Sequence, residues 1–319
     1  MKTQLLYVLV SRPNDPYYEQ ALLSATTARR HNPDATLLLL TDPETQGGLA
    51  ARPQGDEFIR LFTRIIAVPF DAGLSPMLRS RLLKTGMRSL VEGDFLYIDT
   101  DTLITAPLDP IDDIPADIAA CTDLHAPSLM EHPHRSAILN QCKKLGYDAS
   151  GDPLYFNGGV MLARDTEAAR DFFAQWRENY LRGVEKGIRS DQLSLAQTGH
   201  GRLPYRLPDE WNCEIQSGVR FLRDARIVHY MCTYVASGEE GKLFRLNDPA
   251  FLKSLSPEVW AIAEDPFRGL APMTRLFAGE DLHFFQTRRY RFFRSRFRRG
   301  KWSLTEWLLK LRAHLFHTR

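Results

Sequence analysis

Short apolar runs that alternate with longer amphipathic segments constrain the fold of this chain more than any other feature. Residues 5–10 are apolar, residues 17–31 have the pattern of a helix, and residues 36–40 form the next strand, with four leucines after Thr36. This order is that of a β-α-β unit, whose two strands lie parallel in one sheet. Asp15 and Pro16, directly before the helical segment, are typical of an N-cap and of a first helical position. We therefore expect an α/β fold with a mostly parallel sheet and helices on both of its faces.

The same alternation continues towards the middle of the chain. Further strands are predicted over residues 65–68, 95–98, 118–122 and 160–162, and helices over residues 79–90 and 167–180. Residues 46–56 are rich in Gly, Ala and polar side chains and are interpreted as a surface loop. Residues 125–153 hold a short helix candidate and a polar loop, and loops of that length often shape access to a site.

Composition places the chain among ordinary globular proteins. It has 319 residues, of which 44% are hydrophobic and 25% are charged, enough for one large α/β domain with additions. No apolar run approaches the length of a membrane span, and the apolar stretch that follows Met1 is short and lacks a cleavage site. We therefore expect neither a transmembrane segment nor a signal peptide. The four cysteines are widely spaced, which predicts reduced thiols in a cytoplasmic protein.

The motif Asp99-Thr100-Asp101 follows the apolar run at residues 95–98 directly. A strand that is apolar on both faces belongs inside an α/β sheet, where ligands bind beyond the carboxyl ends of the strands. Residues two apart in a strand project to the same side, so Asp99 and Asp101 would form an oxygen-rich pair suited to a divalent cation and a nucleotide. The alternative is that the two aspartates only cap the loop that leads to Pro107.

Three other segments carry candidate site residues. Gly158 and Gly159 precede an apolar strand and would let the backbone approach a ligand closely, although a β-bulge without a function explains them equally well. Asp191 precedes apolar helical residues, and taken alone it is better explained as a helix cap than as a ligand contact. His229 ends an apolar run, where a single histidine usually bonds to backbone.

Taken together, these segments resemble glycosyltransferase family 8, which contains glycogenin and bacterial lipooligosaccharide galactosyltransferases. The resemblance spans residues 4–232 and lies in the order and spacing of the motifs. The motifs are Lys84, Asp99-Thr100-Asp101, Phe156-Asn157-Gly158-Gly159-Val160, Ser190-Asp191-Gln192, Leu207-Pro208-Asp209-Glu210-Trp211-Asn212 and Val228-His229-Tyr230. The resemblance implies a GT-A fold and transfer of a hexose, with retention of anomeric configuration, from a nucleotide sugar that is usually a UDP-sugar.

The resemblance also implies a cofactor and roles for single residues. Mn²⁺, or alternatively Mg²⁺, would be held by Asp99, Asp101 and His229, a donor set that suits either ion. Gln192 would lie beneath the anomeric carbon, and Asp191 is the rival candidate for a nucleophile, although a front-face route without a covalent intermediate is favoured. The implied donor-binding residues are Tyr17 or Tyr18 near the base, Arg81 or Lys84, Asp99, Asn157, Gly158 and Asp191, and the implied acceptor-binding residue is Asp123.

The chain departs from the family after His229. Family members often continue into Gly-x-x-Lys-Pro-Trp, whereas this chain reads Tyr230-Met231-Cys232-Thr233-Tyr234. The usual diphosphate lysine is therefore missing, and Lys242 is a candidate replacement. A nucleotidylyltransferase, or a protein that binds a nucleotide sugar without turnover, stays an alternative.

The last part of the chain is basic and aromatic. Residues 288–319 hold eleven Arg or Lys against the single acid Glu306, so the remaining residues carry a net charge of −8. Ser303-Leu304-Thr305-Glu306 is a capping box that predicts an amphipathic helix. Such a segment favours an anionic membrane surface, although its leucines could instead pack on the catalytic domain. Nucleic acid is less favoured as a partner because the remainder is acidic.

These observations divide the chain into three parts. We expect a GT-A catalytic domain over residues 1–245, a helical connector over residues 246–283 and the basic aromatic tail over residues 284–319. The expected protein is bound peripherally to the cytoplasmic face of the cell membrane. Its expected acceptor is a glycan, lipopolysaccharide or lipooligosaccharide above all.

Overall fold

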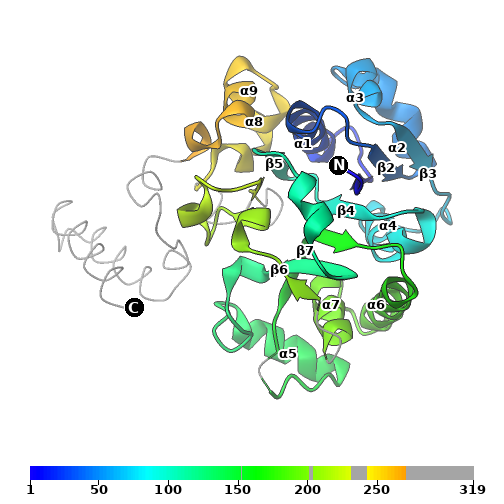
Figure 1. Ribbon diagram of the computed structural model, residues 1–319. Helices are drawn as coiled ribbons and strands as arrows, with labels where there is room; N and C mark the ends of the chain where they lie inside the picture. Colours follow the sequence, from blue (N-terminus) through cyan, green and yellow to red (C-terminus); the bar gives the residue numbers. More distant parts are fainter. Residues whose placement is uncertain (152, 201–203, 231–242, 271–319) are drawn as a thin grey trace, which may run out of the picture.

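A mixed seven-stranded sheet forms the centre of the computed structural model, which describes residues 1–151, 153–200, 204–230 and 243–270 (Figure 1). Its strand order is β3-β2-β1-β4-β7-β6-β8. The strands are β1 (Gln4–Leu9), β2 (Leu37–Thr41), β3 (Arg64–Ala67), β4 (Phe95–Ile98), β6 (Ile118–Thr122), β7 (Phe156–Ala163) and β8 (Tyr205–Arg206). Only β7 runs antiparallel to its two neighbours, β4 and β6, among these pairs. The predicted α/β fold with a mostly parallel sheet is confirmed.

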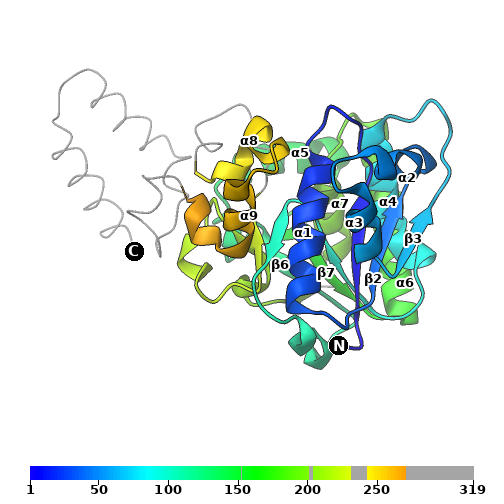
Figure 2. The ribbon, with the colours of Figure 1, turned by 90° about the horizontal axis from the view of Figure 1, so that it is seen from above.

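Helices cover both faces of this sheet. The side chains of β1 alternate between the two faces and therefore reach two separate cores. Leu5 and Tyr7 pack in one core with residues of α1 and α3, whereas Leu6 and Val8 pack in another with residues of α4 and α6. Figure 2 shows α1 and α3 in front of the sheet and α4 and α6 behind it. The helices are α1 (Tyr17–His31), α2 (Pro43–Gly48), α3 (Gly55–Leu61), α4 (Pro76–Leu90), α5 (Arg135–Leu145), α6 (Glu167–Glu185), α7 (Asp191–Gly199), α8 (Pro249–Lys253) and α9 (Pro257–Glu264).

A second, smaller sheet positions His229. It consists of β5 (Thr102–Ile104), β10 (Ile227–His229) and β9 (Cys213–Glu214), in the order β5-β10-β9. His229 pairs with Thr102 on β5 and with Glu214 on β9, so the register places His229 next to the residues that follow β4. The core below this sheet also contains residues of α8 and α9, which contact α1.

Two local expectations were wrong. Residues 46–56 are not a loop, because Asp42 accepts a hydrogen bond from the backbone nitrogen of Thr45 at 2.9 Å and caps α2, and a helical turn and α3 follow. Helix α1 begins one residue later than expected, at Tyr17, with Pro16 as N-cap. The carboxylate of Asp15 still accepts a hydrogen bond from the Tyr17 nitrogen at 3.1 Å.

Other features bear on the remaining sequence predictions. Within the described ranges, no helix is long and apolar enough to cross a membrane. Cys121, Cys142 and Cys213 are buried free thiols. Cys232, Lys242 and the basic aromatic tail at residues 284–319 lie outside the described residues, and the division of the chain at residues 245 and 283 stays a prediction.

Candidate functional site

The two aspartates of the motif lie in the turn between β4 and β5. The sequence predicts that both aspartates extend the strand, but β4 ends at Ile98. The alternation of side chains along a strand therefore does not explain why the two carboxylates lie together. The turn is instead fixed by the backbone: the Asp99 nitrogen donates to the Gly159 carbonyl oxygen at 2.7 Å, and the Thr102 hydroxyl donates to the Asp99 carbonyl oxygen at 2.8 Å. The hydroxyl of Thr100, between the two aspartates, donates to the side-chain oxygen of Gln20 at 3.3 Å.

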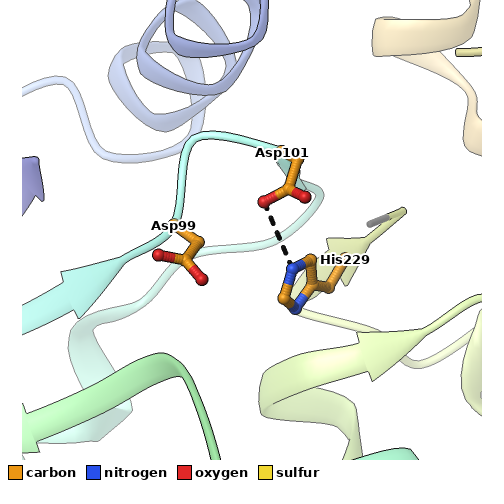
Figure 3. A group of neighbouring side chains, drawn as sticks. All are labelled: Asp99, Asp101 and His229. Atoms are coloured by element: carbon orange, nitrogen blue, oxygen red, sulfur yellow. Dashed lines mark ion pairs between the residues drawn. The ribbon is translucent and has the colours of Figure 1, made fainter. Parts of the chain in front are cut away.

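His229 joins the two carboxylates from the end of β10. Its Nε2 atom lies 3.2 Å from Asp101 Oδ1, and one ligand atom from each of Asp99, Asp101 and His229 lies within 4.8 Å of the others (Figure 3). Within the described residues this is the only cluster of at least three His, Cys, Asp or Glu side chains that could hold a metal ion. Two carboxylates and an imidazole are a donor set that fits Mn²⁺ or Mg²⁺.

The charges of the cluster depend on one another. Burial alone would raise the pKa of Asp101, but the adjacent His229 imidazole outweighs burial and lowers it. Burial alone would lower the pKa of His229, but the Asp101 carboxylate, through its charge and a hydrogen bond, raises it. A divalent cation between the two side chains would take the place of the proton on His229 Nε2.

Basic side chains from α4 connect this cluster to Asp191. Lys84 Nζ lies 3.1 Å from Asp99 Oδ1 and 3.3 Å from Asp191 Oδ2, and Arg81 Nε lies 3.2 Å from Asp191 Oδ1. Asp191 therefore does not cap α7 with its side chain. Ser190 occupies the N-cap position, and Asp191 is the first helical residue. Burial would raise the pKa of Asp191, but Arg81 and then Lys84 outweigh burial and lower it, so this carboxylate is ionised.

A cavity of about 170 Å³ opens beside the aspartates. Its lining includes Tyr17, Gln20, Arg81, Asp99 and Asp101. The sequence left Tyr17 and Tyr18 as alternatives for a contact with the donor. Tyr18 is fully buried, where its hydroxyl donates to the Pro53 carbonyl oxygen at 2.6 Å, whereas Tyr17 is 37% exposed at the cavity.

The two glycines of β7 differ in how closely they approach the cluster. A Cβ atom on Gly159 would lie 2.6 Å from His229 Cε1 and 2.9 Å from Asp99 Oδ2, distances at which these side chains would have to shift. A Cβ atom on Gly158 would meet nothing nearer than Lys84 at 3.5 Å, which is an ordinary contact. Both glycines lie in β7 where its pairing with β6 shifts register, between the pairs Ala120–Met161 and Thr122–Phe156. Of the two glycines, Gly159 makes the close approach to the cluster.

A second polar cluster surrounds Asp123, directly after β6. Oδ1 of Asp123 accepts a hydrogen bond from Asn157 Nδ2 at 2.8 Å, and Oδ2 lies 2.9 Å from His132 Nε2. The nitrogen of His134 donates to His132 Nδ1 at 3.0 Å, so Nε2 carries the hydrogen of His132. Burial would raise the pKa of Asp123, but hydrogen bonds from His132, Asn157 and Gln192 lower it. A carboxylate with these three donors keeps room for about one more.

Sequence reasoning did not assign a role to several residues of the site. Tyr97 donates a short hydrogen bond to Asp99, and burial, followed by the charge of Asp99, raises the pKa of this tyrosine. Nothing in the spacing of His132 indicated its contact with Asp123. Asn212 ends the motif at residues 207–212, and its position there did not indicate that its side chain contacts His229.

Comparison with known proteins identifies the fold. No protein-family model and no curated protein matches this chain. The apo structure of the bifunctional glycosyltransferase WbbM aligns with a TM-score of 0.54 at 15% identity, over 82% of this chain and 51% of the other, so this chain spans about half the length of that protein. The galactosyltransferase LgtC in complex with donor and acceptor sugar analogues aligns with a TM-score of 0.50 at 15% identity, over 82% of this chain and 100% of that chain. The likeness shows the GT-A fold, and membership of family 8 stays a prediction.

Proposed function

We propose that the chain is a retaining glycosyltransferase that moves a hexose from a UDP-sugar to a glycan acceptor with the help of Mn²⁺ or Mg²⁺. The observation that supports this proposal most is the convergence of Asp99, Asp101 and His229 at the cavity that Tyr17 and Arg81 line. The donor set suits a divalent cation, and the cavity beside it offers a place for the nucleotide. The GT-A fold agrees with this assignment.

Asp99, Asp101 and His229 would hold the cation against the donor diphosphate. When bound, the cation supplies Lewis-acid stabilisation of the negative charge that collects on the departing UDP. Arg81 and Lys84 add fixed positive charges on the same side of the site, where Asp191 holds both side chains in place. Charges that are already oriented before the reaction stabilise a developing anion without reorganisation.

Asp191 and Gln192 would face the transferred sugar from the start of α7. The carboxylate of Asp191 accepts hydrogen bonds from sugar hydroxyls, and the Gln192 carbonyl dipole stabilises positive charge at the anomeric carbon. In the front-face route, the bond from the anomeric carbon to the phosphate oxygen breaks and the acceptor oxygen bonds on the same face. The acceptor's proton passes to the leaving phosphate, so no separate general base is needed.

Asp123 would orient the acceptor hydroxyl. Its lowered pKa makes it a hydrogen-bond acceptor rather than a proton-accepting base, and Gln192 connects it to the start of α7. Asn157, which the sequence suggested for the sugar, uses its side-chain oxygen and one amide hydrogen within the protein. One amide hydrogen of Asn157 is left for a ligand.

Lipopolysaccharide or lipooligosaccharide is the acceptor class that we propose, at the cytoplasmic face of the membrane. Its support is the basic and aromatic sequence of residues 284–319, which would attract the anionic surface where lipid-linked glycans are assembled. The acceptor would then meet the site from the membrane side.

A screen for UDP release tests the proposed reaction. The chain is incubated with UDP-glucose, UDP-galactose and their N-acetylated counterparts, with and without Mn²⁺. We expect Mn²⁺-dependent hydrolysis or transfer, and a loss of about 100-fold or more in Asp101→Asn, because the leaving charge is no longer stabilised. Asp224→Asn, a change of the same chemistry at an exposed position, is the matched control and keeps the parent rate.

The products separate this proposal from its alternatives. Release of pyrophosphate from a nucleoside triphosphate identifies a nucleotidylyltransferase instead. Binding of UDP with Mn²⁺, but no release of UDP from any donor and acceptor mixture, identifies a protein without turnover. Equal rates in the parent and in Asp101→Asn overturn the assigned role of the cation.

A further inference from the structure

Asn212 connects the proposed cation site to the Asp123 cluster through side-chain hydrogen bonds. It ends a short helical turn (Asp209–Asn212), its side chain is fully buried, and its Oδ1 atom lies 3.0 Å from His229 Nδ1. On the other side, Asn212 Nδ2 lies 3.1 Å from Asn157 Oδ1. Asn157 Nδ2 in turn donates to Asp123 Oδ1 at 2.8 Å. The order along this chain of contacts is His229, Asn212, Asn157 and Asp123.

Two partners of Asn157, the backbone nitrogen of Gly159 and the carboxylate of Asp123, fix the direction of the hydrogen bonds in this series. The nitrogen of Gly159 lies 2.7 Å from the side chain of Asn157, and since a backbone N–H can only donate, the atom of Asn157 that it meets is the oxygen. The carboxylate of Asp123 can only accept, so the atom of Asn157 that it meets is the nitrogen. Both ends therefore give the amide of Asn157 the same orientation.

That orientation passes on to Asn212 and then to His229. Because Asn157 presents its oxygen, Asn212 must present its nitrogen to Asn157 and its oxygen to the imidazole. An oxygen opposite Nδ1 requires the hydrogen of His229 on Nδ1. Nε2 faces the Asp101 carboxylate and carries the other hydrogen of the protonated ring. Once a divalent cation displaces that hydrogen, Nε2 offers its lone pair to the cation.

We propose that Asn212 is a positioning residue, which sets the tautomer and the ring orientation of His229 so that Nε2 can bind a divalent cation. The inference rests on the proposed function, because it takes His229 as a cation ligand. Groups that hold the second nitrogen of a ligating imidazole raise cation affinity, and their removal typically weakens it about 10- to 100-fold.

Mn²⁺ binding to the full chain tests this assignment without any measurement of turnover. Free Mn²⁺ is followed by electron paramagnetic resonance for the parent, Asn212→Leu, Asn212→Asp and Asp101→Asn. We expect Asn212→Leu to bind Mn²⁺ about 10- to 100-fold more weakly. Asn212→Asp keeps an acceptor for His229 but places a carboxylate oxygen against Asn157 Oδ1, so it also weakens binding.

A matched control separates positioning from a general loss of packing. Asn32 is also a buried asparagine, whose side chain makes two hydrogen bonds at the far end of α1, to the Leu108 nitrogen at 2.8 Å and the Ala28 carbonyl oxygen at 3.2 Å. Asn32→Leu loses comparable contacts and should leave Mn²⁺ affinity unchanged. The imidazole ¹⁵N spectrum of the Mg²⁺-loaded parent, with His229→Gln to assign the signal, should show the hydrogen of His229 on Nδ1.

The outcomes distinguish this inference from the proposed function. Weak binding in Asp101→Asn together with parent-like binding in Asn212→Leu overturns the role of Asn212 and leaves the cation site standing. A hydrogen on Nε2 of His229 in the Mg²⁺-loaded parent overturns it as well. Equal Mn²⁺ binding by the parent and Asp101→Asn overturns both the cation site and the inference.

Discussion

Gly159 shows how little space surrounds the side chains that would hold the cation. Its missing Cβ leaves room for His229 and Asp99, and its backbone nitrogen fixes Asn157. Gly158, its neighbour, lies in a roomier part of the strand. The two adjacent glycines therefore provide a matched pair for a test of the site at the scale of one methyl group.

Gly159→Ala is predicted to disrupt the cluster, whereas Gly158→Ala is predicted to be tolerated. The added methyl group at residue 159 must displace His229 or Asp99, so Mn²⁺ affinity should fall about 10-fold or more. Mn²⁺ titration followed by electron paramagnetic resonance measures both variants. Similar affinities for the two variants would contradict the geometry of the site.

The proposed cation ligands could be predicted from the sequence, because the motifs themselves contain the side chains that would bind the cation. Asp99, Asp101 and His229 were predicted as one group, and the structure brings them together. The sequence could not show that Asp191 pairs with Arg81 and Lys84, since that contact depends on how α4 packs against the start of α7. Taken alone, the position of Asp191 before a helix favoured a cap, and this was wrong.

At the scale of elements, the turn after β6 depends on strand β9. Leu124 and His125 have φ values of 50° and 55°, in the left-handed region that costs a side-chain-bearing residue roughly 1–2 kcal/mol each. Glu214 on β9 holds this turn: its carboxyl oxygen accepts from the Leu124 nitrogen at 2.9 Å, and its nitrogen donates to His125 Nε2 at 3.1 Å. The turn carries Asp123, so β9 supports the proposed acceptor site.

Glu214→Gln is predicted to stabilise the chain increasingly as the pH rises. Burial and then the charge of Asp123 raise the pKa of Glu214 well above its usual value, so above pH 4.5 its carboxyl holds its proton more firmly in the folded chain than in the unfolded chain. The unfolded chain loses this proton near pH 4.5, and the stability that depends on the neutral form decreases above that value. From about pH 5 to about pH 8, the variant should gain on the order of 1–3 kcal/mol over the parent.

Urea unfolding at several pH values measures this difference. Glu264→Gln, which removes a carboxylate from the exposed end of α9, is the control and should show a much flatter pH dependence. A parent and a Glu214→Gln variant with parallel stability curves would show that Glu214 is ionised in the folded chain.

Elements with a strong internal pattern were predicted from the sequence, and short ones were not. The structure has β4 and β6 at the predicted residues, and α6 extends the predicted helix to Glu185. Strands β8 and β9 have two residues each, which is too short for any period to be visible. The register that places His229 between Thr102 and Glu214 depends on tertiary pairing, so no local pattern indicates it.

At the scale of the whole molecule, the chain returns to one edge of its sheet to assemble the site. Four elements supply the side chains of the site: α4 supplies Lys84, the turn after β4 supplies Asp99, α7 supplies Asp191 and β10 supplies His229. Ion pairs of Lys84 with Asp99 and Asp191, and the proximity of Asp99 to His229, join these side chains. The order of the motifs allowed this convergence to be expected.

The proposed attraction to an anionic membrane surface is also tested at the scale of the whole molecule, since the basic tail balances an acidic remainder. Replacement of Arg288, Arg289 and Arg291 with Gln in the full chain removes three charges, each worth about 1 kcal/mol at an anionic surface. Co-sedimentation with anionic vesicles should then weaken by about 100-fold. The same change at the exposed residues Arg135, Lys143 and Lys144 of α5 should have little effect. Equal losses in both variants would contradict a role specific to the tail.

The position of Mn²⁺ in a crystal grown with UDP and Mn²⁺ tests the central claim most directly. An anomalous diffraction map locates the ion without reference to activity. We predict a single strong peak coordinated by the Asp99 and Asp101 carboxylates and by Nε2 of His229. A peak elsewhere, or an imidazole turned away from an ion held only by the aspartates, would contradict the account.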